Sequence, residues 1–378
     1  METYRGIRYG TAQRFGKPSL TPLGEDFIFD PSLHTSTQYC PQIPSRLDSV
    51  MGDLRHSDPS EVGEDCLRVS IFTPSREGSY PVLVWICGGA FVTGSGEYPC
   101  YGGERLSEEG GIVVVNISYR VGVFGFLYQP EKDSVNLGIQ DMVCALRWIK
   151  DHIASFGGDP SRITVCGQSA GAYAIGNIIA MNTALFSKAI MMSGPYTMGA
   201  SGRKGRRIRD EWFSFLEKDT PIRMLIAQGD VMKKEGGALP ICPVGMEMFP
   251  KRKNAPYKAL TEVLLTSQRD DSAPYVKKRA LWGISTMAAF TLPMYLYSWA
   301  LRRCGVRTRT RILSWRHSEG RFGASHTMEV PLLFGTYDRW KDAPMLSGVT
   351  QEEFERESKS FREYIVSFVK GGLTSLQQ

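Results

Sequence analysis

The sequence predicts an α/β fold with a mostly parallel, twisted central sheet covered by helices on both faces. Two observations support this prediction. Apolar, β-branched runs alternate with helix-like segments along the chain, and the runs are almost continuously apolar. Strands of that kind are buried on both faces, which is typical of parallel sheets. The predicted strands are residues 69–72, 82–86, 112–117, 163–166, 189–192, 222–227 and 311–314, and the predicted helices are 137–155, 169–180, 275–301 and 351–370.

Length and composition predict one globular domain. The chain has 378 residues, of which 42% are hydrophobic and 22% are charged. Single α/β domains reach this length on one continuous sheet, so we expect residues 1–378 to form one domain. The net charge of +6 is modest, and no nucleic-acid motif accompanies the basic clusters. We therefore expect a small-molecule partner and no nucleic acid.

Neither the N-terminus nor the longest uncharged stretch predicts a membrane element. The first residues lack the apolar core of a secretory signal, so we expect a cytoplasmic chain as given, or a secreted one if the N-terminus is truncated. Residues 280–301 are uncharged and long enough to span a bilayer. They include several hydroxyl side chains and Pro293, which favours a buried helix broken near that proline.

A candidate nucleophile follows the strand predicted at residues 163–166. Gly167-Gln-Ser169-Ala-Gly171 has the Gly-x-Ser-x-Gly pattern, and a helix-like run follows it. This is the arrangement of a nucleophile elbow, in which small flanking residues permit a tight turn that exposes the serine hydroxyl. The pentapeptide alone occurs often by chance, but the strand before it and the helix after it favour a catalytic Ser169.

A glycine-rich loop follows the strand predicted at residues 82–86. When a serine attacks a carbonyl, the oxygen becomes negative, and aligned backbone N–H groups stabilise it. Small residues allow such close backbone approach. We predict an oxyanion hole formed by Gly89 and Ala90 from this loop and Ala170 after the nucleophile.

Several long segments together carry a family resemblance. The chain resembles the type B carboxylesterases of the α/β-hydrolase fold, a family that includes cholinesterases, fungal lipases and liver carboxylesterases. The resemblance implies a serine esterase that forms an acyl-enzyme and needs neither cofactor nor metal. The matching segments are residues 156–171, which fit the serine signature, and 6–9, 14–15, 40–42, 64–67, 116–126, 136–141 and 186–194.

The resemblance also implies a base and an acid. His326 lies in a segment similar to the family's histidine loop, and its rival His317 lacks that context. The acid should follow a strand between Ser169 and His326. The strand predicted at 222–227 leads to two candidates, Glu235 in a Glu-Gly pair and Asp230 nearer the strand end. We prefer Glu235 and keep Asp230 as the alternative.

The chain departs from the family in three places. Cys87 stands where a histidine usually supports the oxyanion loop, and we expect this thiol to be buried and inert. The lid region is reduced to about residues 195–220, which predicts a shallow or open site. The N-terminus begins almost at the first family motif.

The resemblance further pairs Cys40 with Cys66 as a disulfide. A cytoplasmic location would instead leave two free thiols. The eight cysteines show no closely spaced zinc pattern.

These features predict a hydrolase that cleaves carboxylic esters, with a secondary metabolite as a possible substrate class. Two alternatives use the same fold. One is an acyltransferase, in which an alcohol or amine replaces water at the same triad. The other is a catalytically weak or inactive cholinesterase-like binding protein, which the short lid and Cys87 favour and the retained Ser169 and His326 oppose.

Overall fold

A computed structural model gives the fold of the chain. It describes residues 1–36, 38–53, 62–181, 183–196, 201–213, 219–235, 260, 262–268, 290–315 and 324–371. His317 and Cys242 lie outside the described residues.

One eight-stranded sheet forms the centre of the molecule, in the order β1-β4-β6-β5-β7-β8-β9-β10. The pairs β1/β4 and β4/β6 are antiparallel, and every pair from β6 to β10 is parallel. The predicted fold class is therefore confirmed. The strands are β1 Glu2–Arg8, β4 Arg68–Thr73, β5 Tyr80–Ile86, β6 Val113–Ile117, β7 Gly158–Gln168, β8 Lys188–Met192, β9 Glu262–Gln268 and β10 Arg307–Leu313, and a separate two-stranded sheet pairs β2 Gly10–Thr11 with β3 Ser19–Leu20.

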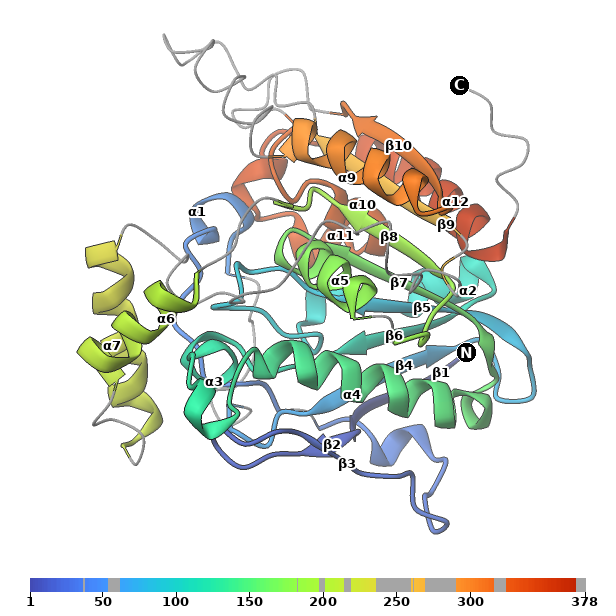
Figure 1. The fold of residues 1–378 in the computed structure, drawn as a ribbon. Coiled ribbons are helices and arrows are strands. Elements are labelled where there is room, and N and C mark those ends of the chain that lie inside the picture. The colour runs from blue at the N-terminus through green and yellow to red at the C-terminus, as the bar shows by residue number, and fades with distance from the viewer. Residues whose placement is uncertain are drawn as a thin grey trace, which may run out of the picture.

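Helices cover both faces of this sheet (Figure 1). One face carries α4 Leu137–His152, α5 Ala170–Ala180 and α9 Leu292–Arg303, and the other carries α2 Glu104–Gly110, α10 Glu329–Phe334 and α12 Gln351–Lys370. Among the described residues, no helix combines the length and apolar character needed to cross a membrane. The shorter helices are α1 Asp48–Met51, α3 Gly122–Phe126, α6 Gly202–Ile208 and α11 Tyr337–Trp340.

The central strands form because their side chains are apolar on both faces. Every residue of β6 is buried, as are Pro81 to Ile86 of β5. The parallel register aligns Ile86 of β5 with Gly167 of β7, and Gln168 of β7 with Met192 of β8. The carboxyl ends of these strands therefore meet at one edge of the sheet, where α/β proteins place their sites.

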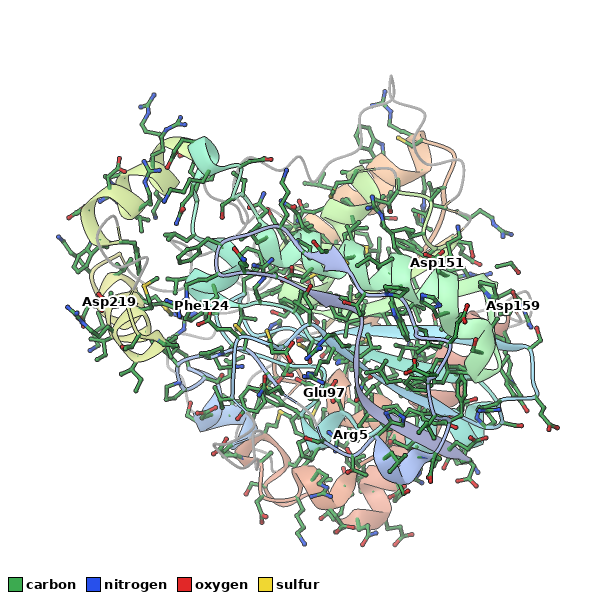
Figure 2. The ribbon with its side chains drawn as sticks, turned by 90° about the horizontal axis from the view of Figure 1, so that it is seen from below. Arg5, Glu97, Phe124, Asp151, Asp159 and Asp219 are labelled. Carbon is green, nitrogen blue, oxygen red and sulfur yellow. The ribbon has the colours of Figure 1, made fainter. Side chains whose placement is uncertain are left out.

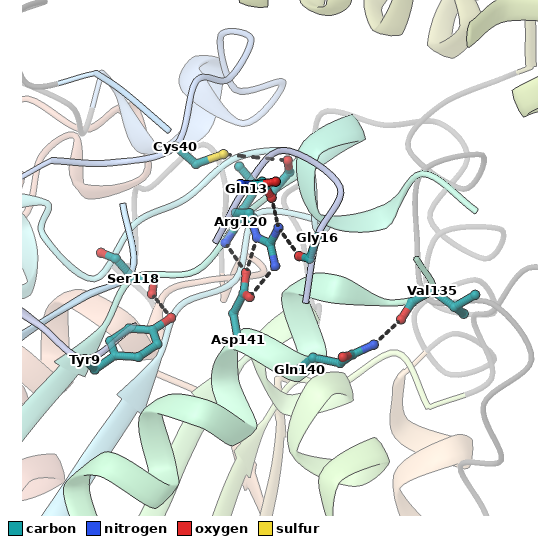
Figure 3. Close-up of polar contacts among 10 residues, drawn as sticks. Tyr9, Gln13, Gly16, Cys40, Ser118, Arg120, Val135, Gln140 and Asp141 are labelled. Atoms are coloured by element: carbon teal, nitrogen blue, oxygen red, sulfur yellow. Dashed lines mark hydrogen bonds and ion pairs between the residues drawn. The ribbon is translucent and has the colours of Figure 1, made fainter. Parts of the chain in front are cut away.

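A buried ion pair fixes the segment after β6 against α4 (Figure 3). The Arg120 guanidinium donates to Asp141 Oδ1 at 2.7 Å and to Asp141 Oδ2 at 2.8 Å, and it also donates to the Gly16 carbonyl at 2.8 Å. Arg120 is 4% exposed and Asp141 is fully buried. Because the pair is dry, loss of either partner would leave an uncompensated charge in the core.

A second polar contact joins β1 to the loop after β5 (Figure 2). Arg5 donates to the Glu97 carbonyl at 2.7 Å, and Ser70 donates to Glu97 Oε2 at 2.5 Å. Glu97 is 3% exposed, and its carboxylate is compensated by the Ser70 hydroxyl and by the Arg5 guanidinium, which lies 3.8 Å from Oε2.

The structure corrects the sequence prediction at residues 222–227. These residues belong to α7 Pro221–Glu235, not to a strand. Met224, Gln228 and Val231 are buried, whereas Ile222 and Ile226 are exposed. That spacing is helical.

Four strands were not predicted, namely β1, β9 and the two-residue strands β2 and β3, and two other predictions are only partly described. Of the helix predicted at 275–301, the described part is α9, preceded by residues 290 and 291. The region 195–220, where a reduced lid is expected, contains α6 and the π-helical turn η6 Arg209–Phe213. Both stand with α7 beside the sheet (Figure 1).

Candidate active site

Ser169 occupies a strained turn between β7 and α5. Its φ of 55° and ψ of −119° are rare for a residue with a side chain. Gly167 and Gly171 permit this turn. A Cβ on Gly167 would lie 2.7 Å from the Gly171 carbonyl carbon, and a Cβ on Gly171 would collide with the Ile86 carbonyl oxygen. The turn is a nucleophile elbow in geometry as well as in sequence.

His326 faces the serine from the loop that leads into α10. Its Nε2 lies 2.9 Å from Ser169 Oγ, a hydrogen-bond distance. The Gln168 side-chain nitrogen lies 3.4 Å from the same Nε2, and the Phe290 ring packs against the imidazole with centroids 4.9 Å apart. Two segments distant in sequence thus place a base beside a hydroxyl.

Burial lowers the pKa of His326 from its ordinary 6.5 to about 4. The ring keeps partial contact with solvent, but the surrounding protein disfavours its charged form. The imidazole is therefore neutral at pH 7. A neutral ring with Nε2 as acceptor can take the Ser169 proton.

The loop of the predicted oxyanion donors reaches Ser169 through Gly88 and Gly89, which line the same pocket. Gly89 has φ 112° and Ala90 has φ 55°, and a Cβ on Gly88 would lie 3.1 Å from Ser169 Cβ. Ala170 is the first residue of α5, directly after Ser169. Among the described residues, the backbone N–H groups of Gly89 and Ala90 donate to no backbone acceptor. The loop can therefore offer them to a developing negative charge.

Backbone strain is concentrated around this site. Ala90, Phe91, Ser169, Ser193 and Thr327 all have positive φ without being glycine. Each lies just beyond a sheet strand or within one residue of His326. Such conformations cost about 1–3 kcal/mol each and persist where the surrounding structure enforces them, which is common at catalytic sites.

Neither of the two residues predicted as the acid, Glu235 and Asp230, follows a strand in the structure. Both belong to α7. Asp230 is exposed and pairs with Lys233 at 3.8 Å. Figure 1 shows α7 well separated from α10, the helix that follows His326. In the described part of the chain, no hydrogen bond is found at His326 Nδ1.

On the side away from β7, β8 pairs in parallel with β9, a strand that was not predicted from the sequence. Its residues 263–265 are apolar and could have indicated a strand, but Glu262 and the three polar residues after Leu265 weaken the pattern. The first carboxylates after β9 in the sequence are Asp270 and Asp271. Both lie outside the described residues.

Glu329 is a buried carboxyl group that the sequence analysis did not single out. It lies on α10, three residues after His326, and is 1% exposed. Burial raises the pKa of Glu329 from 4.5 to about 7, although the side chains of Ser193 and Gln168 favour its ionised form. Gln168 thus contacts both His326 and this second ionisable group.

The cysteines near the site are thiols. Cys87 is fully buried, and burial raises its pKa to about 12, so this thiol is not a nucleophile at neutral pH. Cys40 and Cys66 are free, not a disulfide. A hydrogen bond with Cys40, together with burial, raises the pKa of Cys66. Within the described residues no cluster of metal-binding side chains occurs.

A pocket lies over Ser169. Ser169, Gly88 and Gly89 line it together with two tyrosines. Gln42 and Leu47 from the segment leading into α1, and Met51 at the end of α1, also line it. A mainly apolar pocket next to a nucleophile is suited to an acyl or aromatic group.

The model of the carboxylesterase family matches residues 1–215. The chain belongs to the carboxylesterase family. A probable N-octanoylanthranilate hydrolase, AqdA2, of Rhodococcus erythropolis is 34% identical over 412 aligned residues, which cover 98% of this chain and 89% of that protein. The para-nitrobenzyl esterase of Bacillus subtilis strain 168 is 41% identical over 201 residues, covering 50% of this chain and 40% of that enzyme.

Solved structures agree with this membership. A structure titled PNB esterase superposes with a TM-score of 0.80 at 25% identity, covering 98% of this chain and 87% of that one. A thermophilic PNB esterase superposes with a TM-score of 0.78 at 26% identity. This carboxylesterase therefore has the α/β-hydrolase fold and is a carboxylic ester hydrolase.

Proposed function

We propose that Ser169 is the nucleophile and His326 the general base of this carboxylesterase. The 2.9 Å contact between Ser169 Oγ and His326 Nε2 at the strained turn carries the proposal. As Oγ bonds to the substrate carbonyl carbon, its proton passes to Nε2 and the carbonyl π electrons move to the oxygen. The resulting oxyanion accepts hydrogen bonds from the N–H groups of Gly89, Ala90 and Ala170.

The acyl-enzyme forms when the tetrahedral intermediate collapses. The bond to the leaving group breaks, and the proton on His326 Nε2 transfers to the departing oxygen or nitrogen. Water then attacks the acyl carbon and gives a proton to Nε2. The bond from the acyl carbon to Ser169 Oγ breaks, and the proton on Nε2 returns to Oγ as the acid product leaves. An alcohol or amine in place of water would make the same step an acyl transfer.

The acid that orients His326 is assigned to the segment after β9. In the α/β-hydrolase order the acid follows a strand end between the serine and the histidine, and β9 is the parallel strand next to β8. Strand order and sequence therefore favour Asp270 or Asp271 over Asp230 and Glu235 as the acid.

The substrate class is an acyl ester or amide of an aromatic compound. The pocket over Ser169 combines Leu47 and Met51 with Tyr98 and Tyr101, which suits apolar and aromatic groups. The relative from Rhodococcus erythropolis, which this chain matches along 98% of its length, is named for an octanoyl amide of anthranilate. A divergent member acting on a secondary metabolite fits both observations.

Hydrolysis of three matched substrates tests this assignment. The substrates are p-nitrophenyl octanoate, p-nitrophenyl acetate and N-octanoylanthranilate, each offered to the wild type and to Ser169→Ala. We expect turnover of both octanoyl compounds to exceed that of the acetate and to vanish in Ser169→Ala. Turnover that survives in Ser169→Ala would contradict the mechanism, and acetate as the best substrate would contradict the substrate class. A folded wild type inactive on all three would favour the binding-protein alternative.

A further inference from the structure

The loop that carries Gly89 and Ala90 is neither helix nor strand. This oxyanion loop, residues 88–94, contains three consecutive residues with positive φ, Gly89, Ala90 and Phe91. The backbone N–H groups of Val92 and Thr93 donate to the Gly89 carbonyl at 3.0 and 3.1 Å. These bonds shape the turn internally but do not fix its position relative to Ser169. That position depends on contacts from outside the loop.

Gln42 makes such a contact at the end of the oxyanion loop. Its Oε1 accepts a hydrogen bond from the Gly94 N–H at 2.7 Å, and its Nε2 donates to the Gly94 carbonyl at 3.3 Å. The amide of one side chain thus pairs with both backbone polar groups of a single residue. Nε2 also donates to the Cys40 carbonyl at 3.1 Å, and Oε1 accepts from the Tyr98 hydroxyl at 2.9 Å.

The chemistry of these four bonds specifies an amide. Two partners of Gln42 are carbonyl oxygens that need a donor, and the other two are N–H and O–H groups that need an acceptor. A side-chain amide supplies two donors and one oxygen with two lone pairs, so all its hydrogen-bonding capacity is used. The reversed amide orientation would oppose donor to donor and acceptor to acceptor.

Gly94 links Gln42 to the residues that pack against Ser169. Gly94 has φ 114°, and a Cβ on it would collide with the Gly88 carbonyl oxygen, so the two ends of the oxyanion loop touch. Gly88 in turn packs against the elbow, where a Cβ on it would lie 2.7 Å from the Gln168 carbonyl oxygen and 3.1 Å from Ser169 Cβ. A shift of Gly94 therefore moves the residues that face the nucleophile.

Two further contacts secure other parts of this region. The Tyr119 hydroxyl donates to the Cys87 carbonyl at 2.9 Å just before the loop, and the Gly122 N–H donates to the Phe91 carbonyl at 2.6 Å in its middle. The neutral Cys87 thiol is only a weak hydrogen-bonding group. Among the described residues, the hydrogen bonds to the peptide groups of Gly94 come from Gln42.

We propose that Gln42 is a positioning residue for the oxyanion hole, because its amide fixes Gly94 and through it Gly88 to Ala90 relative to Ser169. The proposal rests on the acyl-transfer mechanism proposed above. Gln42 also lines the pocket over Ser169, but the four hydrogen bonds of its amide all go to protein groups, so it acts through the loop. Its removal should weaken binding of the transition state more than binding of the substrate.

The first test compares the wild type with Gln42→Met, which is similar in length but cannot form the four bonds. We expect kcat to fall about 10- to 100-fold, the scale of a misplaced oxyanion donor, while KM changes less than about threefold. A trifluoromethyl ketone forms a tetrahedral oxyanion adduct with a serine. Its inhibition constant should therefore rise by the same factor as kcat/KM falls.

Gln42→Glu provides a matched variant whose bonding changes with pH. Its ionised carboxylate can accept from Gly94 and Tyr98 but cannot donate to the two carbonyls. Once protonated, it has one O–H donor and regains part of the amide's pattern. The ratio of its kcat to that of the wild type at the same pH should rise as the pH falls from 8 to 5. The corresponding ratio for Gln42→Met should stay constant.

These outcomes separate the proposal from general destabilisation and from the mechanism itself. Thermal unfolding and fluorophosphonate labelling of Ser169 confirm that each variant is folded and retains its nucleophile. If folded, labelled Gln42→Met keeps kcat within twofold of the wild type, Gln42 is not a positioning residue. A flat pH ratio for Gln42→Glu would also overturn the proposal. Failure of wild-type labelling would instead contradict the mechanism.

Discussion

Ser169 Oγ and His326 Nε2 lie 2.9 Å apart although 157 residues separate them in the sequence. Parallel strands produce this contact because their carboxyl ends meet at one edge. There β7 ends directly before Ser169, and β8 anchors the turn through the bond from the Ser169 N–H to the Met192 carbonyl at 2.9 Å. The loop after β5 approaches the same edge and carries Gly89 and Ala90, the proposed oxyanion donors.

The first prediction concerns the acid. Replacing Asp230, which is exposed and paired with Lys233, by asparagine should leave kcat/KM within about twofold, since surface pairs of this kind contribute little. Replacing the true acid should lower kcat by about 10⁴-fold, as for other triads. We therefore expect Asp270→Asn or Asp271→Asn to be the damaging change. A comparable loss in Glu235→Gln, with both aspartate variants active, would restore the assignment made from sequence.

The second prediction concerns the pH dependence of turnover. Burial alone lowers the pKa of His326 to about 4, and a carboxylate facing the ring would raise it by stabilising the imidazolium. Activity requires the neutral ring, so kcat/KM is lost as the pH falls through that pKa. In the variant that lacks the acid, the midpoint of this loss should shift down towards about 4. An unchanged midpoint would mean that the deleted carboxylate does not face His326.

The third prediction concerns Glu329 and stability. Its folded-state pKa of about 7 exceeds its ordinary 4.5, so the protonated form favours folding. This favourable contribution is present below pH 4.5 and is lost as the pH rises through 7. Glutamine cannot ionise. Relative to the wild type, Glu329→Gln should therefore gain up to about 3 kcal/mol between pH 5 and pH 9, measured by chemical denaturation. A difference that does not change with pH would show that Glu329 titrates alike in both states.

The fourth prediction concerns the buried pair of Arg120 and Asp141. Asp141→Asn removes the charge that compensates a guanidinium only 4% exposed. We expect a loss of about 3–5 kcal/mol in the free energy of unfolding. Asp65→Asn is the matched control, because Asp65 pairs with Arg68 at 2.6 Å but keeps 41% of its side chain exposed. That change should cost about 1 kcal/mol or less. Equal losses in the two variants would contradict the difference in burial.

The sequence predicted what depends on local pattern. The strands β5 and β7 were found because buried parallel strands are continuous apolar runs, and Ser169 because its elbow requires glycines at fixed positions. Residues 222–227 were misassigned because a short apolar run does not distinguish strand from helix. The helical spacing of Met224, Gln228 and Val231 appears only over a longer window.

The remaining features depend on contacts between distant segments. β9 was missed because Glu262, Thr266 and Ser267 are buried polar residues within a strand. The bonds of Gln42 to Gly94 and the burial of Glu329 arise only when the sheet brings separate loops together. No periodicity or motif spacing in the chain encodes them.

Peptide mapping after reaction with a fluorophosphonate tests the central claim most directly. The activated serine should displace fluoride and carry the phosphonyl group, so we predict a single adduct on the peptide that contains Ser169. The adduct should be absent in Ser169→Ala and strongly reduced in His326→Ala. A folded wild-type protein that remains unlabelled, or one labelled at a residue other than Ser169, would contradict the account.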